Sequence, residues 1–362
     1  MEYPGMATLT IHATNITGLG ASQVVLSFLK GLDSLATQYT QVDCYVPSYG
    51  VVSSFEPQNE NIRVHRFKRF GPNVISRILE CLFPKFFFDI GDHLIVLGDV
   101  PLRVPTQQIL FIHQAHLLNP KVNRFVGNSL KFRGMRIITR INAAFVSRVI
   151  VQTSAMASEL KSSYPDWAAR DCVRVVSQPK PEWSDLLHRG RVQRSLEGGL
   201  RLFYPADSYP HKNHRIFDML TAENCKGIIN EVVITLDSDQ ELIRKSLLNY
   251  VGRLNQEECI REYQMADALI FPSFIESYGL PLIEAMSVGI PIIVADLPYA
   301  RALCGEEAIY FDPTSEESLI AACASLKMQL EKGWYPDWKP FLSNLPGNWK
   351  NVVSSFLKEF YD

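Results

Sequence analysis

The sequence is poor in cysteine and in long apolar runs. Its 362 residues include seven scattered cysteines, with no Cys-x-x-Cys pair and no His/Cys cluster. We therefore expect neither a disulfide framework nor a zinc site, and a reducing compartment is the simpler interpretation. No stretch reaches about 18 apolar residues, and no basic region followed by an apolar run opens the chain, so we predict neither a spanning helix nor a signal peptide.

The sequence also lacks repeats of 20–50 residues and low-complexity tracts, which excludes a solenoid. Hydrophobic residues make up 47% and charged residues 20% of the chain, and its length favours two globular domains. Residues 1–180 carry 19 Lys/Arg against 12 Asp/Glu, a balance of +7, whereas residues 181–362 carry 17 against 26, a balance of −9. This asymmetry suggests that the first half meets something anionic.

Short apolar runs rich in β-branched residues alternate with helical stretches throughout the chain. The predicted strands of the first half are residues 7–13, 40–47, 93–99, 107–114 and 148–154, with a further strand entering a proline-rich linker near residues 173–183. Those of the second half are residues 200–206, 231–237, 267–273, 291–296 and 308–313. Helices are predicted over residues 211–222, 257–266, 281–288, 316–333 and 348–361. The alternation indicates parallel sheets covered on both faces, in domains over 1–178 and 179–347, with the helix at about 348–362 packing back on the first domain.

The stretch "FIESYGLPLIEAM" (residues 274–286) connects a predicted strand to a predicted helix. Such a loop lies at the carboxyl edge of a parallel sheet, where doubly wound folds bind ligands. Gly279 allows a ligand close to the backbone, and Pro281 suits the first helical position. First-turn amides then form a phosphate seat. Glu284 would contact a diol such as a ribose, and Glu276 would face the other side of the phosphate; the alternative is that Glu284 is a favourable first-turn acid and Glu276 a solvated loop acid.

Basic residues gather at the start of the helix predicted after residue 206. They are His211, Lys212, His214 and Arg215, and because cations at a helix start oppose its dipole, we expect them to meet an anion. A solvated basic face is the alternative. The "LDSD" run at residues 236–239 resembles a metal-chelating Asp-x-Asp, but we favour a helix N-cap.

Two features of the first half mark a ligand site. Gly18-Leu19-Gly20 is a strand-to-helix turn, although Gln23 replaces the third glycine of the dinucleotide fingerprint and no Walker lysine follows, so a plain tight turn is equally open. His113 ends an apolar strand and would face the cleft between domains, with a satisfied structural histidine as the alternative. His116 makes a metal pair conceivable, but no neighbouring carboxylates complete such a site.

The segment from Lys121 to Arg148 holds seven Lys/Arg and no acid. Arg133, Arg136 and Arg140 would share a helical face, and "RVHRFKRF" (residues 63–70) and "PKFFF" (residues 84–88) add basic and aromatic surface. This composition suits an anionic membrane surface or a lipid-diphosphate acceptor, with a solvated helix face as the alternative. No nucleic-acid motif is present, so we expect no nucleic-acid partner.

Together these motifs resemble glycosyltransferase family 4. The Glu276-x7-Glu284 pattern in "PSFIESYGLPLIEAMSVGIPIIVAD" is similar to the signature of that family, and "YPHKNH", "ITGLGASQVVLSFLKGL" and "FIHQAH" resemble its other blocks. The likeness is strong over residues 200–313 and looser over 1–180. It implies the GT-B fold, with two Rossmann-like doubly wound domains facing across a cleft, and a retaining, nucleotide-sugar-dependent enzyme.

The resemblance also implies a role for each matching residue. Glu276, Lys212 and His113 would be catalytic: Glu276 faces the donor sugar, Lys212 stabilises the leaving diphosphate, and His113 lines the sugar site. The donor would be bound by Gly18, Gly20, Tyr278, Gly279, Leu280, Pro281, Glu284, Arg253 and His211. The family carries an Arg near the position of Ala206, and whether Arg215, Arg253 or His211 replaces its charge is open.

The resulting expectation is a cytoplasmic enzyme, with peripheral docking on the inner face of the membrane left open. It would need no metal or other cofactor. It would transfer a sugar from a nucleotide-diphosphate donor to a glycan or lipid-linked saccharide in polysaccharide or lipopolysaccharide synthesis. GDP-mannose-like donors are typical of members with the "HKNH" motif. Arg133, Arg136 and Arg140 would serve the acceptor or the membrane. A nucleotide-sugar epimerase of the same fold and a non-catalytic sugar-nucleotide-binding protein are the alternatives.

Overall fold

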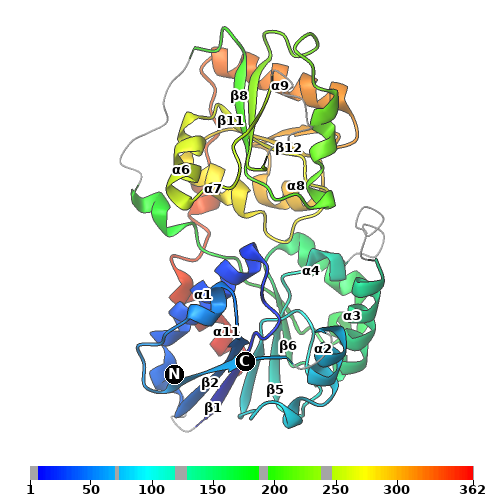
Figure 1. Ribbon diagram of the computed structural model, residues 1–362, viewed down its shortest axis with the longest axis vertical. Helices are drawn as coiled ribbons and strands as arrows, with labels where there is room; N and C mark the ends of the chain where they lie inside the picture. The colour runs from blue at the N-terminus through cyan, green and yellow to red at the C-terminus, as the bar shows by residue number, and fades with distance from the viewer. Residues whose placement is uncertain (1–6, 70–72, 119–128, 187–194, 238–246, 362) are drawn as a thin grey trace. The chain divides into compact units, whose positions relative to one another are not determined.

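The computed structural model describes residues 7–69, 73–118, 129–186, 195–237 and 247–361 (Figure 1). The described chain forms two compact units. The first holds the residues up to Pro179 together with those from Pro346 on, and the second holds those from Lys180 to Leu345. Each unit is an α/β domain around one parallel sheet.

The first unit contains a seven-stranded parallel sheet in the order β3-β2-β1-β4-β5-β6-β7. Its strands are β1 (Thr8–His12), β2 (Gln41–Pro47), β3 (Ile62–Phe67), β4 (His93–Val96), β5 (Gln107–Phe111), β6 (Arg148–Val151) and β7 (Val173–Val175). Its helices are α1 (Leu19–Asp33), α2 (Asn73–Leu82), α3 (Ser129–Asn142), α4 (Ser154–Ser163), α5 (Pro165–Ala169) and α11 (Trp349–Lys358). Because the interior strands are buried on both faces, they read as continuous apolar runs, as in "HLIV" of β4.

The C-terminal helix α11 belongs to the first unit, where it packs against α1. Its Val353 and Phe356 are fully buried, and the Phe356 ring meets that of Phe28 edge-on at 5.0 Å. Glu359, just past the helix, pairs with Arg148 of β6 at 3.1 Å and with Arg174 of β7 at 3.4 Å. Apolar burial and ion pairs therefore hold the end of the chain on the sheet formed by its beginning.

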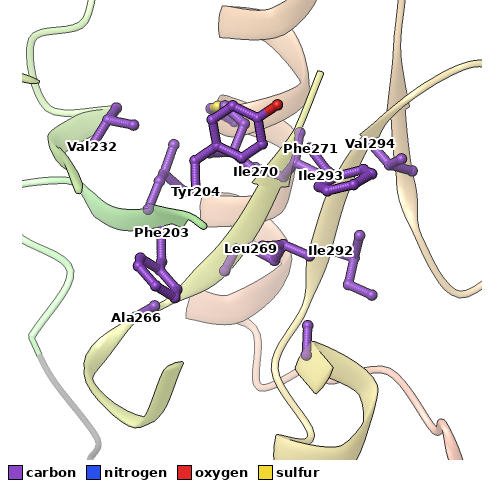
Figure 2. Close-up of a cluster of buried hydrophobic side chains, with 14 of the residues drawn as sticks. Phe203, Tyr204, Val232, Ala266, Leu269, Ile270, Phe271, Ile292, Ile293 and Val294 are labelled. Carbon is purple, nitrogen blue, oxygen red and sulfur yellow. The ribbon is translucent and has the colours of Figure 1, made fainter. Parts of the chain in front are cut away.

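The second unit contains a six-stranded parallel sheet in the order β10-β9-β8-β11-β12-β13. Its strands are β8 (Leu200–Tyr204), β9 (Ile229–Ile234), β10 (Leu248–Tyr250), β11 (Ala268–Phe271), β12 (Ile292–Ala295) and β13 (Ile309–Phe311). Its helices are α6 (Gln256–Met265), α7 (Leu280–Val288), α8 (Pro298–Cys304), α9 (Glu316–Glu331) and α10 (Lys339–Leu342). Figure 2 shows the buried side chains that β8, β11 and β12 contribute to the core of this unit.

The sheets confirm the predicted class, two doubly wound α/β domains, but one predicted helix is wrong. Residues 211–222 form two short 3-10 segments, η8 (Pro210–Lys212) and η9 (His214–Met219). Asn213 separates them in the left-handed region, at φ 56°. The basic residues therefore do not sit at the start of an α-helix, and the dipole argument for them fails. The helix predicted after Asp237 lies outside the described residues.

The structure adds two edge strands that the sequence did not predict. The predicted basic surface at residues 63–70 is largely β3, an edge strand on which Arg63, His65 and Arg66 are exposed. At the far edge of the second sheet lies β10, only three residues long. Both lack the continuous apolar run that marks a central strand, because an edge strand is covered less completely.

Candidate functional site

The second sheet has its topological switch point between β8 and β11. These strands are neighbours, and the chain leaves them in opposite directions, towards β9 and β10 on one side and β12 and β13 on the other. The loops that follow both strands lie at the carboxyl edge, where a crevice for ligands forms in open α/β sheets. The loop after β8 carries Lys212 and the loop after β11 carries Glu276.

Lys212 and Glu276 meet in this crevice although 64 residues separate them. The Lys212 Nζ donates to Glu276 Oε1 at 2.6 Å, and the side chains are only 14% and 11% exposed. The ammonium also lies 5.5 Å from the centroid of the Phe271 ring, at the end of β11. Such a shielded ion pair interacts more strongly than a solvated one, because water screens it less.

A set of hydrogen bonds fixes the two loops that carry this pair. The Tyr204 hydroxyl, at the end of β8, donates to the Lys212 carbonyl at 2.6 Å, and the Phe274 amide donates to the His211 carbonyl at 2.8 Å. The Asn213 side-chain amide donates to the carbonyls of Pro272 and Pro313 at 3.3 and 2.9 Å. The left-handed turn at Asn213 thus ties the basic loop to its neighbours and fixes the Lys212 backbone.

The helix α7 begins directly after Glu276's loop, with Gly279 at its N-cap. Gly279 has φ 71°, and a Cβ there would lie 2.9 Å from Leu282 Cδ1, so only glycine fits without strain. No side chain caps this end, and no acid lies in the first turn. The helix starts at Leu280, so Pro281 is its second residue rather than its first, and Glu284 lies beyond the first turn.

Glu284 is held by Tyr263, a fully buried residue of α6. The Tyr263 hydroxyl donates to Glu284 Oε2 at 2.7 Å, and the Trp183 ring stacks on the Tyr263 ring with centroids 6.4 Å apart. Burial raises the pKa of Glu284, and the Tyr263 hydrogen bond offsets part of that rise. The carboxylate is therefore oriented, partly shielded, and placed one turn beyond the uncapped amides.

Other predicted donor residues lie around this edge with less direct contacts. His211 is half-buried beside Lys212 and stacks on Tyr209, with ring centroids 5.6 Å apart. Tyr278 is 2% exposed and belongs to the core. Arg253 is exposed in the loop between β10 and α6, and within the described chain no contact joins it to Lys212 or Glu276.

In the first unit, Gly18 and Gly20 flank the exposed start of α1. Gly18 is the N-cap at φ −73°, and a Cβ at either glycine would meet nothing within 4 Å. Neither the backbone nor the packing within this unit therefore requires glycine at these positions. The space above them is open to an incoming group.

His113 lies two residues beyond β5 and is neutral. Burial lowers the pKa of His113 to about 3, although its ring donates a hydrogen bond to the Leu97 backbone. Its Nε2 is buried and has no hydrogen-bond partner among the described residues. The backbone amides of His113 and Gln114 donate to Asp99 Oδ1 at 2.6 and 2.9 Å. The imidazole thus presents an unused acceptor, as a sugar hydroxyl would require.

The three predicted surface arginines all lie on α3, but only two face solvent. Arg133 and Arg140 are exposed, and Arg140 lies 5.8 Å from the Tyr164 ring centroid. Arg136 is half-buried and donates to the His116 carbonyl at 3.2 Å. Burial also lowers the pKa of Arg136. Arg136 therefore contributes less to a docking surface than the helical spacing predicts.

Sequence reasoning missed three residues that position the site: Tyr204, Asn213 and Tyr263. Each acts through a partner at least several residues away, and Tyr263 lies 21 residues before Glu284. Its only signal was an aromatic residue inside the polar helix "EECIREYQM".

In the described ranges, no group of three or more His, Cys, Asp or Glu side chains is placed to hold a metal ion. No helix that the structure describes is both long and apolar enough to cross a bilayer.

Comparison with known proteins places the part of the site that carries Glu276 and Glu284 in a recognised family region. Residues 237–331, which include Glu276, Gly279 and Glu284, match the family model described as "Glycosyl transferases group 1". The chain is 27% identical over 129 residues to the O-antigen chain mannosyltransferase RfbU of Salmonella typhimurium, covering 33% of this chain and 36% of that protein. In the first two curated matches the chain spans only 20% and 36% of the relative's length.

Solved structures show the same fold over almost the whole chain. WaaG, a glycosyltransferase involved in lipopolysaccharide biosynthesis, matches with a TM-score of 0.62 at 11% identity, covering 97% of this chain and 99% of that one. Anabaena HepE in complex with UDP and glucose matches with a TM-score of 0.56 at 13% identity, covering 96% and 95%. The chain therefore has the GT-B fold, and the comparisons support a glycosyltransferase.

Proposed function

We propose that the protein is a retaining glycosyltransferase of family 4 that uses a nucleotide-diphosphate sugar. The observation that carries the proposal is the Lys212–Glu276 pair at the switch point of the second sheet, beside the uncapped start of α7. A cation and free amides suit a diphosphate, and a carboxylate suits sugar hydroxyls. Because relatives in O-antigen synthesis are mannosyltransferases, we take a GDP-mannose-like donor as the first candidate.

In this proposal each side chain has a separate duty. Glu284, oriented by Tyr263, accepts hydrogen bonds from the ribose hydroxyls. The diphosphate lies at the start of α7, within reach of Lys212, which stabilises the charge that develops on it as the sugar leaves. Glu276 orients the sugar hydroxyls, and His113 Nε2 of the first unit is proposed to accept a hydrogen bond from a sugar hydroxyl. The oxygen of the departing phosphate assists deprotonation of the acceptor hydroxyl. That hydroxyl attacks the anomeric carbon from the same face that the diphosphate leaves.

The acceptor is proposed to be a glycan or lipid-linked saccharide, met by the first unit at an anionic membrane surface. Exposed large apolar side chains cluster on α2, the adjoining 3-10 turn η3 (Pro84–Phe86) and α3; they are Val74, Ile75, Phe83, Phe86, Leu130, Ile137 and Ile141. Exposed Lys85, Lys131, Arg133 and Arg140 lie among them. Apolar side chains flanked by cations suit insertion into an anionic leaflet.

A donor panel tests the reaction. GDP-, UDP- and ADP-sugars are incubated with candidate acceptors, and release of the nucleoside diphosphate and of the glycoside is followed for wild type and Glu276→Ala. We expect transfer with one donor, the anomeric configuration kept, and a loss of turnover of about 100-fold or more in the variant. Donor conversion without acceptor would instead indicate an epimerase, and unchanged transfer in the variant would contradict the proposal.

Liposome co-sedimentation tests the membrane surface. Vesicles of phosphatidylglycerol are expected to retain the protein, and vesicles of phosphatidylcholine are not. The Arg133→Gln, Arg140→Gln double variant should lose much of this binding, since each cation near an anionic surface contributes about 1 kcal/mol. Full retention of the double variant would show that α3 is not the docking site.

A further inference from the structure

The first sheet has its own switch point, between β1 and β4. Residues that follow β1 and β4 meet there, and Arg69, which follows β3, donates to the Thr14 hydroxyl at 3.4 Å. Asn15, after β1, donates to the Gly98 carbonyl after β4 at 3.0 Å, and Arg77 of α2 donates to the same carbonyl at 2.9 Å. This crevice is the position in which an open α/β sheet binds a ligand, and the donor site in the second unit does not use it.

A fully buried carboxylate, Glu80 of α2, organises this crevice. Arg69 donates to Glu80 Oε1 at 2.7 Å through Nε, and Arg77 donates to Oε2 at 3.5 Å through Nη1. The hydroxyls of Thr14 and Ser76 donate to the same carboxylate at 2.8 and 3.2 Å. Glu80 thus accepts hydrogen bonds from four side chains, and two of these carry a positive charge.

The direct contacts of this cluster contain two arginines and one carboxylate. His12 lies 4.0 Å from Glu80, but burial and the two arginines lower the pKa of His12 well below its usual value, so it stays neutral. Asp99 is close enough to interact with Arg77 through space, but within the described chain no ion pair or hydrogen bond joins the two side chains, and Asp99 Oδ1 accepts from backbone amides instead. One arginine is enough to balance the charge of Glu80. The second guanidinium then has no counter-ion of its own in a poorly solvated position, which costs free energy unless an anion binds there.

The guanidinium groups retain unused donors that reach solvent. Their side chains are 17% exposed for Arg69 and 14% exposed for Arg77. Within the described chain, Arg69 Nη1 and Arg77 Nε have no partner. Nearby, Asn15 Oδ1 is buried without a partner, and a Cβ on Gly98 would lie 2.0 Å from it, so glycine keeps the wall of the crevice in place.

We propose that Arg69 and Arg77 bind a phosphate group of the acceptor. Two fixed guanidinium groups with free donors match the oxygens of a phosphate ester or diphosphate better than a neutral sugar. Glu80 holds both groups in place, and the open loop carrying Gly18 leaves room for the attached saccharide. The proposal deepens the proposed function, on which it rests for the identity of the ligand as an acceptor, and it names the acceptor's chemical class.

The binding test uses inorganic phosphate in a Lys212→Gln background, which removes the cation of the donor site. Phosphate titrated against chloride at equal ionic strength should raise the unfolding midpoint of this protein. Adding Arg69→Gln or Arg77→Gln should weaken phosphate binding about tenfold each, by loss of a charge-assisted hydrogen bond. Arg66→Gln, which alters an exposed arginine of β3, is the matched control and should leave the midpoint shift unchanged.

Glu80→Gln separates this role from a merely structural one. If the arginines serve only to neutralise Glu80, adding Arg69→Gln or Arg77→Gln will leave the phosphate-dependent midpoint shift of the Lys212→Gln protein unchanged, and the proposal is overturned. If they bind phosphate, Glu80→Gln will retain or strengthen the shift, because the crevice gains positive charge. Should Arg77→Gln fail to fold, the Arg77→Gln, Glu80→Gln pair removes both charges together and carries the same expectation of weakened binding.

A kinetic comparison identifies the source of the phosphate in the otherwise unaltered protein. Acceptors that share one sugar as methyl glycoside, glycosyl phosphate or polyprenyl diphosphate glycoside are compared by KM. If both phosphorylated acceptors have a lower KM than the methyl glycoside and Arg77→Gln abolishes this difference, phosphate recognition is supported. If only the polyprenyl acceptor has a lower KM and Arg77→Gln keeps that difference, the preference is for the lipid and the proposal is contradicted. If no acceptor is glycosylated, the proposed function fails, while the phosphate titration still decides the site.

Discussion

Replacing Glu276 by Gln should affect nucleotide binding and sugar transfer in opposite directions. In the free protein the Lys212 ammonium donates to the Glu276 carboxylate at 2.6 Å, in a place where both side chains are nearly 90% shielded. A nucleoside diphosphate must share that cation with Glu276. Glutamine keeps the size and one acceptor oxygen of glutamate but removes its charge, so Lys212 becomes more available to the diphosphate.

The magnitudes follow from the hydrogen bond that is weakened. In the variant only one partner of this hydrogen bond is charged, so roughly 1 kcal/mol, within the spread of about 1.5–3 kcal/mol for hydrogen bonds to charged groups, becomes available to the ligand. Affinity for the nucleoside diphosphate should therefore rise about fivefold. Transfer should fall about 100-fold, because the group that orients the sugar in the transition state has lost its charge.

Calorimetric titration with the nucleoside diphosphate and initial rates of transfer measure the two effects. Glu331→Gln is the matched control, since Glu331 pairs with Lys327 on α9 of the same unit, and neither quantity should change in it. If Glu276→Gln weakens nucleotide binding and transfer together, Glu276 contacts the nucleotide and its assigned role is wrong. Unchanged transfer would remove Glu276 from the reaction altogether.

Three further predictions concern single side chains. Tyr263→Phe removes the hydrogen bond that lowers the pKa of Glu284, so this pKa should rise. The acid side of the pH profile of the donor KM should then move to higher pH while the alkaline plateau is kept, and an unmoved profile would show that Glu284 does not bind the donor. Gly279→Ala should lower the free energy of unfolding in urea by about 1–2 kcal/mol because of its φ of 71°, and by more because the new Cβ clashes with Leu282. Gly289→Ala is the control, since Gly289 has φ 82° but open space around it, and equal losses in the two variants would refute the clash. Burial raises the pKa of Asp99 to about 6, above its ordinary value of 3.8. Between these pH values the unfolded chain ionises Asp99 but the folded protein does not, so the free energy of unfolding falls as pH rises. Asp99→Asn should therefore be more stable than wild type by about 2–3 kcal/mol above pH 6, with the advantage shrinking towards pH 4, and a pH-independent difference in chemical denaturation would contradict this.

The sequence carried most of the fold and the acids of the site, because both depend on local patterns. Apolar runs followed by glycine or proline marked β11 and α7, and so placed Glu276 and Glu284 at a sheet edge. The basic segment after β8 was placed correctly but predicted as a helix. Its 3-10 turns depend on Asn213, whose side chain contacts Pro313, 100 residues away. Local propensity cannot register such a contact.

The paired and buried charges were the least predictable features. The Lys212–Glu276 contact spans 64 residues, and nothing in either segment indicates that the two side chains meet. Arg69 belonged to a run that reads as solvated basic surface, yet it pairs with the fully buried Glu80. Both contacts arise because parallel strands bring distant loops to one edge, so they follow from sheet order and not from spacing.

Binding of nucleoside diphosphates to wild type and to Glu284→Gln tests the central claim most directly. Calorimetric titration with GDP, UDP and ADP should show one of them binding at one site per chain. The variant should bind that nucleotide at least about tenfold more weakly, through loss of a charge-assisted hydrogen bond to the ribose. Failure of all three nucleotides to bind, or equal binding by the variant, would contradict the assignment of this edge of the second sheet as the donor site.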